Sequence, residues 1–243
     1  MHRIGIVKAM QAEARPLIDR LGLRSVPVPW DVRLPPKLWT GTHGGVEVDL
    51  VWLGEDARHG VDLIGTSAAT LATSLLLSYR AIDVVISAGT AGGFASRGGE
   101  IGKVYLSRDS ICFHDRRVPI DGFRESAMGE HPCMDTAALA DELEYERGVV
   151  STGDSLDAPP TDLKTMARLG TRAKEMEAAA VAWVASLHGV PMVAIKAITD
   201  IVDGPHATEA EFMEHLHTAS DRLAAAVERV VPRIATYAGS RRL

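Results

Sequence analysis

The sequence predicts a layered α/β fold built on a largely parallel central sheet. Short β-rich apolar runs alternate along the chain with longer runs of helical periodicity, which is the pattern of strands joined by crossover helices. The chain has 243 residues, of which 46% are hydrophobic and 24% are charged, so it can bury one sizeable core. Because no repeat, low-complexity tract or linker interrupts it, we expect residues 1–243 to form a single domain.

The predicted strands are short and rich in Val, Ile and Leu. They cover residues 4–7, 38–42, 46–53, 83–87, 104–113, 149–151 and 192–198. Gly44 and Gly45 separate the second strand from the third and indicate a hairpin. The glycine-rich run 88–93 follows the fourth strand, and it is either a tight strand exit or a place where the backbone approaches a ligand closely.

The predicted helices lie between these strands. They cover residues 11–21, 61–79, 160–169, 177–187 and 209–234. Residues 27–36 contain four prolines, and residues 116–132 show no clear period, so both segments are predicted to be loops.

The charge and cysteine content exclude several classes of protein. The net charge is −6, and the basic pair Arg241-Arg242 is predicted to be a solvated chain end, so neither nucleic acid nor a membrane is an expected partner. Two cysteines favour a reducing compartment, and no apolar run is long enough to span a bilayer. The first residues lead directly into a strand instead of a signal peptide, so we expect a cytoplasmic protein.

Ligands of open α/β sheets bind beyond the carboxyl ends of the strands, where this chain carries three isolated carboxylates. Glu13 follows the first strand, Glu177 begins a predicted helix, and Asp200 follows the last strand. Taken singly, each has a simple structural explanation, because helix starts and turns favour acidic residues. The pairs Cys112/His114 and His215/His217 are explained by packing and by opposite helix faces, so we expect no metal site.

Four segments, taken together and in this order, resemble the nucleoside phosphorylase superfamily and, more narrowly, the 5'-methylthioadenosine nucleosidases. They are IVKAMQAEA at 6–14, ISAGTAGGF at 86–94, STGDSLD at 151–157, and KEMEAAA at 174–180 with KAITD at 196–200. A further run, FHDRRVPI at 113–120, is similar to the plant-type enzymes. Leu156 and Lys196 agree with this, because the bacterial pattern has an aromatic residue and an arginine at those positions.

The resemblance implies a three-layer fold with a mixed, twisted central sheet flanked by helices. It also implies a homodimer in which segment 113–119 of the neighbouring subunit completes the 5' pocket. The implied reaction is hydrolysis of the N-glycosidic bond of 5'-methylthioadenosine, with S-adenosylhomocysteine as a further candidate substrate and with no metal or organic cofactor.

This chemistry assigns a role to each carboxylate. Asp200 is expected to protonate adenine N7, which requires a pKa raised by burial. Glu13 is expected to stay ionised and activate water, while Glu177 accepts hydrogen bonds from the ribose hydroxyls and favours the cationic transition state. The other expected substrate contacts are Met10, Thr90, Gly92, Phe113, Leu156, Lys174, Glu175 and Met176.

Three rival functions remain to be weighed against hydrolysis. Phosphorylases of the related bacterial type carry an arginine three residues before Thr90, where this chain has Ser87, and Glu13 would repel phosphate. A non-catalytic nucleoside-binding member could share the fold, although the complete carboxylate set argues against it. A dinucleotide-dependent oxidoreductase is disfavoured, because run 88–93 does not match the Gly-x-Gly-x-x-Gly fingerprint.

Overall fold

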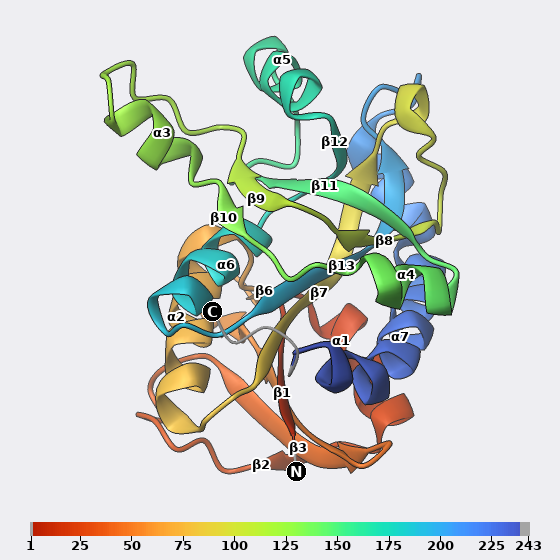
Figure 1. Cartoon of the computed structure of the whole chain (residues 1–243). Helices are drawn as coiled ribbons and strands as arrows, with labels where there is room; N and C mark the ends of the chain where they lie inside the picture. The colour runs from red at the N-terminus through yellow and green to blue at the C-terminus, as the bar shows by residue number, and fades with distance from the viewer. Residues whose placement is uncertain (1, 239–243) are drawn as a thin grey trace.

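The computed structural model describes residues 2–238 and has a central sheet covered by helices on both faces (Figure 1). Arg241 and Arg242 lie outside the described residues. The strands are β1 Arg3–Lys8, β2 Arg24–Val26, β3 Lys37–His43, β4 Val46–Trp52, β5 Glu55–Asp56, β6 Val61–Asp62, β7 Val84–Gly93, β8 Val104–Ser107, β9 Ser110–Phe113, β10 His131–Pro132, β11 Glu146–Thr152, β12 Thr171–Glu175 and β13 Met192–Ile201. The helices are α1 Gln11–Leu21, α2 Gly65–Tyr79, α3 Phe123–Met128, α4 Ala137–Leu143, α5 Pro160–Leu169, α6 Ala178–Leu187 and α7 Thr208–Ala238, with a 3₁₀ turn η1 at Ala95–Arg97.

The central sheet is mixed, as the resemblance implied. Its strand order is β10-β9-β11-β8-β13-β7-β1-β4-β3-β2, and β12 pairs with both β11 and β7. The neighbours β13, β7, β1 and β4 run parallel, whereas β2, β3 and β4 pair antiparallel with one another in turn. β8 is antiparallel to β13 on one side and parallel to β11 on the other. The parallel centre therefore brings the carboxyl ends of β1, β7 and β13 to one edge of the sheet.

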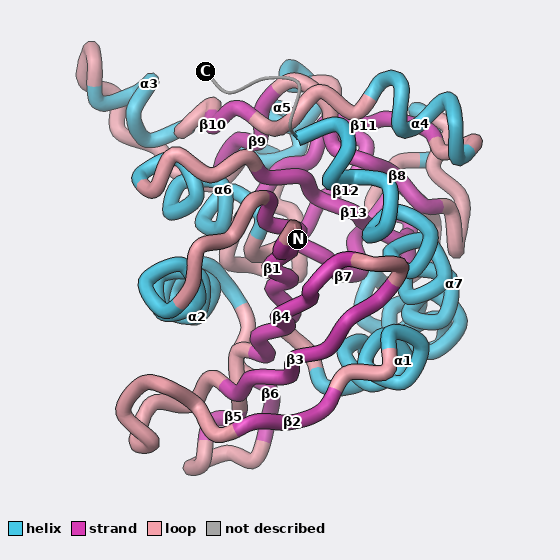
Figure 2. Tube along the Cα trace, turned by 60° about the horizontal axis from the view of Figure 1, so that its bottom comes forward, coloured by secondary structure: helices cyan, strands magenta, loops and turns pink. Residues whose placement is uncertain are grey.

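Two apolar layers hold the helices against the sheet. Helices α2 and α6 cover one face, and α1, α4 and α7 cover the other, an arrangement visible from two directions (Figures 1 and 2). The alternation along β7 supplies both layers, because Val85 points into the first while Val84 and Ile86 point into the second. Among the described residues, no helix is long and apolar enough to cross a membrane.

Several elements differ from the sequence-based predictions. Helices 11–21 and 160–169 are confirmed, but the helix predicted from residue 61 begins at Gly65, because 61–62 form β6. The strand predicted at 104–113 is divided into β8 and β9, and the predicted loop 116–132 contains α3. β12 and α4 were not predicted: β12 consists mostly of polar residues, and the apolar spacing of α4 extends over only seven residues.

The glycine-rich run 88–93 is not a strand exit. β7 continues through it to Gly93, because β13 and β12 supply hydrogen-bonding partners on both sides. β13 likewise continues to Ile201, so Asp200 lies within the strand and not beyond it. A register irregularity between Ile198 and Asp200 interrupts the pairing with β7 at that point, and such irregularities re-aim side chains beside functional sites.

Candidate functional site

A cavity of about 480 Å³ opens at the edge where β1, β7, β12 and β13 meet. Ten of the eleven residues expected at a substrate site line it: Met10, Glu13, Thr90, Gly92, Leu156, Lys174, Glu175, Met176, Glu177 and Asp200. The remaining lining residues are Ala9, Gly60, Val61, Asp62, Ile64, Ala91, Thr199 and Phe212. The fold thus joins segments that are far apart in the sequence into one largely apolar cavity with carboxylates on its wall.

Glu13 lies in the first turn of α1 and is 3% exposed. Its Oε1 accepts a hydrogen bond from the backbone N–H of Thr90 at 2.6 Å, and its Oε2 lies 3.5 Å from Lys8 Nζ. Burial by itself would raise the pKa of Glu13, but Lys8, Thr90 and Lys196 together hold that pKa below its ordinary value. Glu13 is therefore a buried carboxylate kept in its charged form.

The pKa of Asp200 is shifted in the opposite direction to that of Glu13. Burial raises the pKa of its carboxyl, and the Thr199 hydroxyl and Lys174 offset this only in part. Thr199 Oγ1 donates to Asp200 Oδ1 at 2.8 Å, which fixes the orientation of the carboxyl group. A Cβ atom at Gly92 would lie 2.7 Å from Asp200 Oδ2, so the glycine is required for the carboxyl group to lie against β7.

Glu175 and Glu177 are two residues apart, but their carboxylates accept hydrogen bonds at the starts of different helices. Glu175 accepts hydrogen bonds from the backbone N–H groups of Glu177 and Ala178 and from the Thr152 hydroxyl, so it caps the start of α6. Glu177 Oε1 instead accepts the N–H of Gly65 at 2.8 Å, at the start of α2. The principal contacts of Glu175 are thus within the protein, whereas Glu177 is partly exposed to the cavity.

The ionisation of Glu177 differs from the expectation. Burial and the neighbouring Glu175 raise its pKa to about 7, although Lys196 and the Gly65 amide act in the other direction. Near neutral pH both forms of Glu177 are therefore populated, whereas we expected the charged form alone. The largest cause is the burial of Glu177 itself, which the sequence does not show, and the second is the carboxylate of Glu175, two residues away.

Lys174 holds the loop that follows β11. Its Nζ donates to the carbonyl oxygens of Ser155 and Leu156, each at 2.8 Å. Burial lowers the pKa of Lys174, while Asp200 and Asp157 counteract this. The ammonium group therefore places Leu156, whose side chain is 42% exposed, at the wall of the cavity.

Phe113 is the expected site residue that does not line the cavity. Its ring is 2% exposed and packs within its own chain, with the Arg116 guanidinium over its face and His131 against its edge. Its contact with substrate stays a prediction. The exposed residues of the same segment lie further along, at Arg116, Arg117, Pro119 and Ile120.

Sequence reasoning missed the wall formed by residues 60–64 and by Phe212. Residues 61–64 were assigned to a helix, although Val61 and Ile64 are exposed apolar residues of the kind that line binding sites. Phe212 lies near the start of α7, and its aromatic side chain in an otherwise polar turn was the available signal. Lys8 was also missed, despite being a charged residue at the end of an apolar strand.

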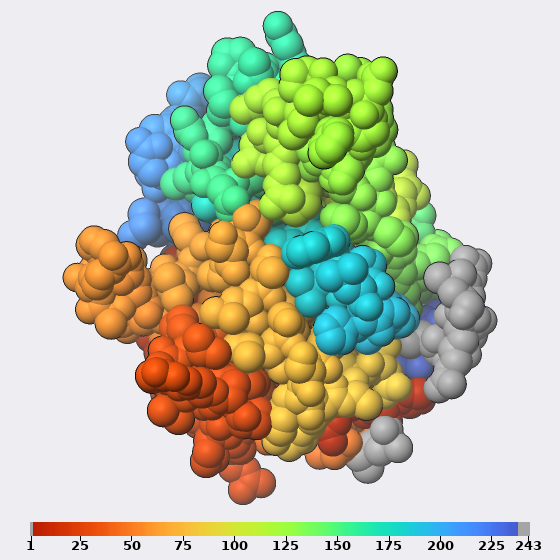
Figure 3. All heavy atoms as spheres, turned by 90° about the vertical axis from the view of Figure 1, so that its left-hand side faces the viewer, coloured from red at the N-terminus to blue at the C-terminus, as the bar shows by residue number. Residues whose placement is uncertain are grey.

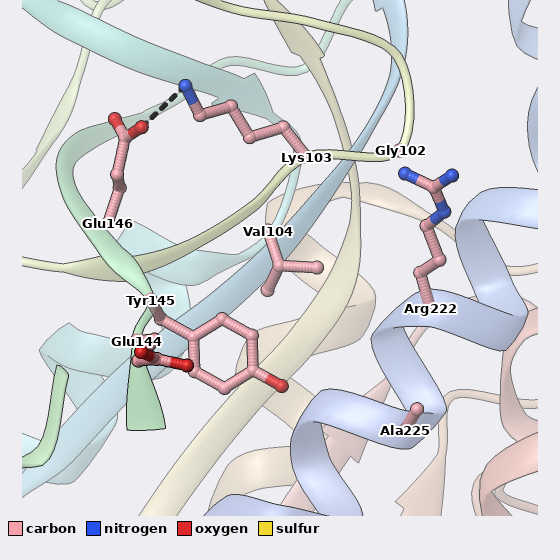
Figure 4. A pocket seen from close by; sticks show the side chains of 8 residues that line it. All are labelled: Gly102, Lys103, Val104, Glu144, Tyr145, Glu146, Arg222 and Ala225. Carbon is pink, nitrogen blue, oxygen red and sulfur yellow. Dashed lines mark ion pairs between the residues drawn. The ribbon is translucent and has the colours of Figure 1, made fainter. Parts of the chain in front are cut away.

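A second hollow, of about 350 Å³, lies away from these carboxylates (Figure 4). It is lined by Gly102, Lys103, Val104, Glu144, Tyr145, Glu146, Arg222 and Ala225. Its Lys103 ammonium pairs with Glu146 at 2.6 Å, and none of the residues expected at a substrate site reaches it. The first cavity, with its buried acids of opposite pKa shift, is therefore the candidate active site.

Comparison with known proteins agrees with this architecture. The family model described as the phosphorylase superfamily matches residues 3–232. The chain belongs to the phosphorylase superfamily. Membership of this superfamily agrees with the mixed central sheet flanked by helices.

Within the phosphorylase superfamily, the chain is similar to plant nucleosidases. It is 39% identical over 226 residues to the 5'-methylthioadenosine nucleosidase of Arabidopsis thaliana, covering 93% of this chain and 84% of that relative. It is 37% identical to a 5'-methylthioadenosine/S-adenosylhomocysteine nucleosidase of the same plant, covering 94% and 90%. The structure of the Arabidopsis thaliana 5'-methylthioadenosine nucleosidase in apo form superimposes with a TM-score of 0.92 at 36% identity, covering 100% of this chain and 98% of that one.

Proposed function

We propose that this protein hydrolyses the N-glycosidic bond of 5'-methylthioadenosine to adenine and 5-methylthioribose. The observation that carries the proposal is the opposite pKa shift of two buried acids at one cavity, lowered for Glu13 and raised for Asp200. Acid–base chemistry at one substrate requires such a pair, one group holding its proton and the other ready to accept one. The names of the two plant relatives support this choice of substrate.

Adenine leaves poorly as an anion, so N7 must be protonated as the bond breaks. Asp200 is the proposed donor, because its buried carboxyl group retains its proton to a higher pH than an exposed one would. Thr199 and Gly92 keep the carboxyl group against β7. Leu156, held by Lys174, supplies an apolar surface for the purine ring.

The ribose develops positive charge as the bond breaks, and the other two carboxylates stabilise it. Glu13 orients and deprotonates the attacking water, and Thr90 can bind the water or the ribose. Glu177 accepts hydrogen bonds from the ribose hydroxyls. Met10 and Met176 line the cavity and suit a thioether, since methionine packs adaptably.

The cavity favours water over phosphate as the attacking nucleophile. Among the described lining residues there is no arginine, and the single lysine, Lys174, donates to two carbonyl oxygens. The ionised Glu13 would repel a phosphate dianion. Phosphorolysis is therefore the second candidate reaction, and S-adenosylhomocysteine is the second candidate substrate, supported by the name of one plant relative.

An adenine-release assay on both thionucleosides, with and without phosphate, tests the proposal. We expect release from 5'-methylthioadenosine at a rate independent of phosphate and with free 5-methylthioribose as the second product. Formation of a ribose 1-phosphate would establish a phosphorylase. Substrate binding by calorimetry without any release would establish a non-catalytic nucleoside-binding protein.

We also propose that the protein is a homodimer in which segment 113–119 of the neighbouring subunit completes the 5' end of the cavity. On one face, α6 lies beside α2 below residues 113–132 (Figure 3). There α6 exposes 44% of Trp183 and 68% of Leu187, and Ile64 beside the cavity is 49% exposed. Light scattering tests the dimer, and Leu187→Asp should weaken it whereas Leu187→Met should not.

Two further expectations accompany this proposal. The cavity draws on residues from Ala9 to Phe212, which supports a single catalytic domain over 1–243. The thiols Cys112 and Cys133 are both free, which agrees with a cytoplasmic location. Fluorescent-fusion imaging tests the location, and limited proteolysis tests whether the chain divides into separate units.

A further inference from the structure

Lys8 is a buried ammonium group that the proposed mechanism has not used. It ends β1, between β4 and β7, and its side chain is completely buried. Its Nζ makes no hydrogen bond to any described residue. Its ion-pair contact is with Glu13 Oε2 at 3.5 Å. Burying an ammonium group costs free energy unless a nearby negative charge compensates it. Glu13 is the carboxylate that compensates the charge of Lys8.

The other lysine near this site has different partners. Lys196 Nζ pairs with Glu175 Oε2 at 2.8 Å and donates to Ser87 Oγ at 3.2 Å. Its charge contributes to the field at Glu13, but its contacts within hydrogen-bonding distance are with the cap of α6 and with β7. Of the two lysines, Lys8 is therefore the one that forms an ion pair with Glu13.

We propose that Lys8 is a positioning residue for the glycosidic reaction, fixing Oε2 of Glu13 and holding the carboxylate in its charged form. The inference rests on the proposed function, since it concerns the same water-activating carboxylate. The Thr90 N–H fixes Oε1 by a hydrogen bond, and the Lys8 ammonium attracts Oε2 across 3.5 Å, so the two contacts together orient the carboxylate. Lys8 is not among the described residues lining the cavity, so it acts on substrate only through Glu13.

The surrounding charges agree with this role. Glu13 faces Lys8 from β1, Lys196 from β13 and Thr90 from β7, and it also interacts with Asp62 of β6 and with Glu177 before α6. Burial lowers the pKa of Lys8 to about 8, with Glu13 opposing the decrease, so the ammonium is charged at neutral pH. Removing its charge should raise the pKa of Glu13, because Lys8 is the largest favourable influence on that pKa and, among the described residues, the one cation paired with Glu13; Lys196 would still lower the pKa from a greater distance.

Neutral substitutions of Lys8 test the inference through kinetics. Lys8→Met and Lys8→Gln should lower kcat about 10- to 100-fold, part of the contribution of a general base, with KM changed less than about threefold. Lys8→Arg, which keeps the positive charge, should restore much of the rate. Lys164→Met, at an exposed lysine on α5, is the matched control and should leave kcat and KM unchanged.

A double-mutant cycle shows whether Lys8 acts through Glu13. In a Glu13→Gln background, measured by single turnover with excess enzyme, Lys8→Met should have no further effect. An equal loss in both backgrounds would overturn the proposal, as would neutral Lys8 variants with wild-type kcat.

A second measurement does not depend on turnover. NMR with ¹³C-labelled glutamate, with Glu13 assigned by its absence from Glu13→Gln, should show its pKa raised by about one unit or more in Lys8→Met. If the wild-type protein releases no adenine, the proposed function fails, and this titration still decides separately whether Lys8 holds Glu13 in its charged form. An unchanged Glu13 titration in Lys8→Met would overturn it.

Discussion

Replacing Asp200 with asparagine removes one titratable proton from the cavity and changes little else. The amide oxygen can still accept the Thr199 hydroxyl, which lies at 2.8 Å, and the amide group occupies the same space against Gly92. The variant should therefore fold and bind substrate, but it cannot transfer a proton to adenine N7. Positioned general acids contribute about 10²- to 10⁴-fold, which corresponds to about 2.7–5.4 kcal/mol of transition-state stabilisation.

Adenine release from 5'-methylthioadenosine, followed at steady state, measures this loss in Asp200→Asn. We expect kcat to fall by at least about 100-fold while the calorimetric Kd changes by less than about threefold. Asp203→Asn is the matched control, because Asp203 lies three residues further on, caps η1 and is absent from the described cavity wall. Turnover of Asp200→Asn within a few-fold of wild type would show that another group protonates the base.

Stability provides an independent check on the environment of Asp200. Its pKa is raised in the folded protein, so the folded state favours the protonated carboxyl. Stability is therefore lost as pH rises from the unfolded pKa of about 3.9 through the folded pKa, and the full penalty applies above it. Asp200→Asn lacks this penalty and should have a Tm equal to or above that of the wild type at alkaline pH. A lower Tm at alkaline pH would contradict the burial argument.

The remaining predictions concern the other site residues. Glu13→Gln should lose kcat yet retain substrate affinity, because water activation and not binding is removed; a variant that only binds weakly would reassign Glu13. Gly92→Ala should lower both kcat and Tm, since its Cβ would lie 2.7 Å from Asp200 Oδ2; wild-type behaviour would contradict the close approach. Because the pKa of Glu177 is about 7 and its charged form serves the ribose, kcat/KM should rise with pH across neutrality, and a flat profile would oppose this. 5'-Methylthioadenosine should have a higher kcat/KM than S-adenosylhomocysteine, because the apolar part of 113–120 suits a methyl group better than a charged tail; equal values would indicate a dual-substrate enzyme.

Local sequence patterns were sufficient for several elements. Helices 11–21 and 160–169 have the predicted bounds, because each combines an apolar period with a glycine directly after its last residue. The Gly44-Gly45 hairpin was likewise predictable from its turn residues. The carboxylates could be selected because strand ends are where α/β folds bind ligands.

Other features depend on contacts between residues far apart in the chain. Run 88–93 has poor intrinsic preference for a strand, yet it forms the end of β7 because β13 and β12 pair with it. β12 carries charged residues inside the sheet, which no apolar pattern could indicate.

The chemistry of the site likewise depends partly on local sequence and partly on contacts that form only in the folded protein. Residue types and positions selected Glu13, Glu177 and Asp200 as candidates, but the ionisation state of each depends on its burial and on the charges close to it. Lys8 is five residues from Glu13 in sequence, and only folding turns it from a strand residue into a cation 3.5 Å from the carboxylate. Electrostatic energy depends on distance and desolvation, and both are set when the sheet and its helices close around the cavity.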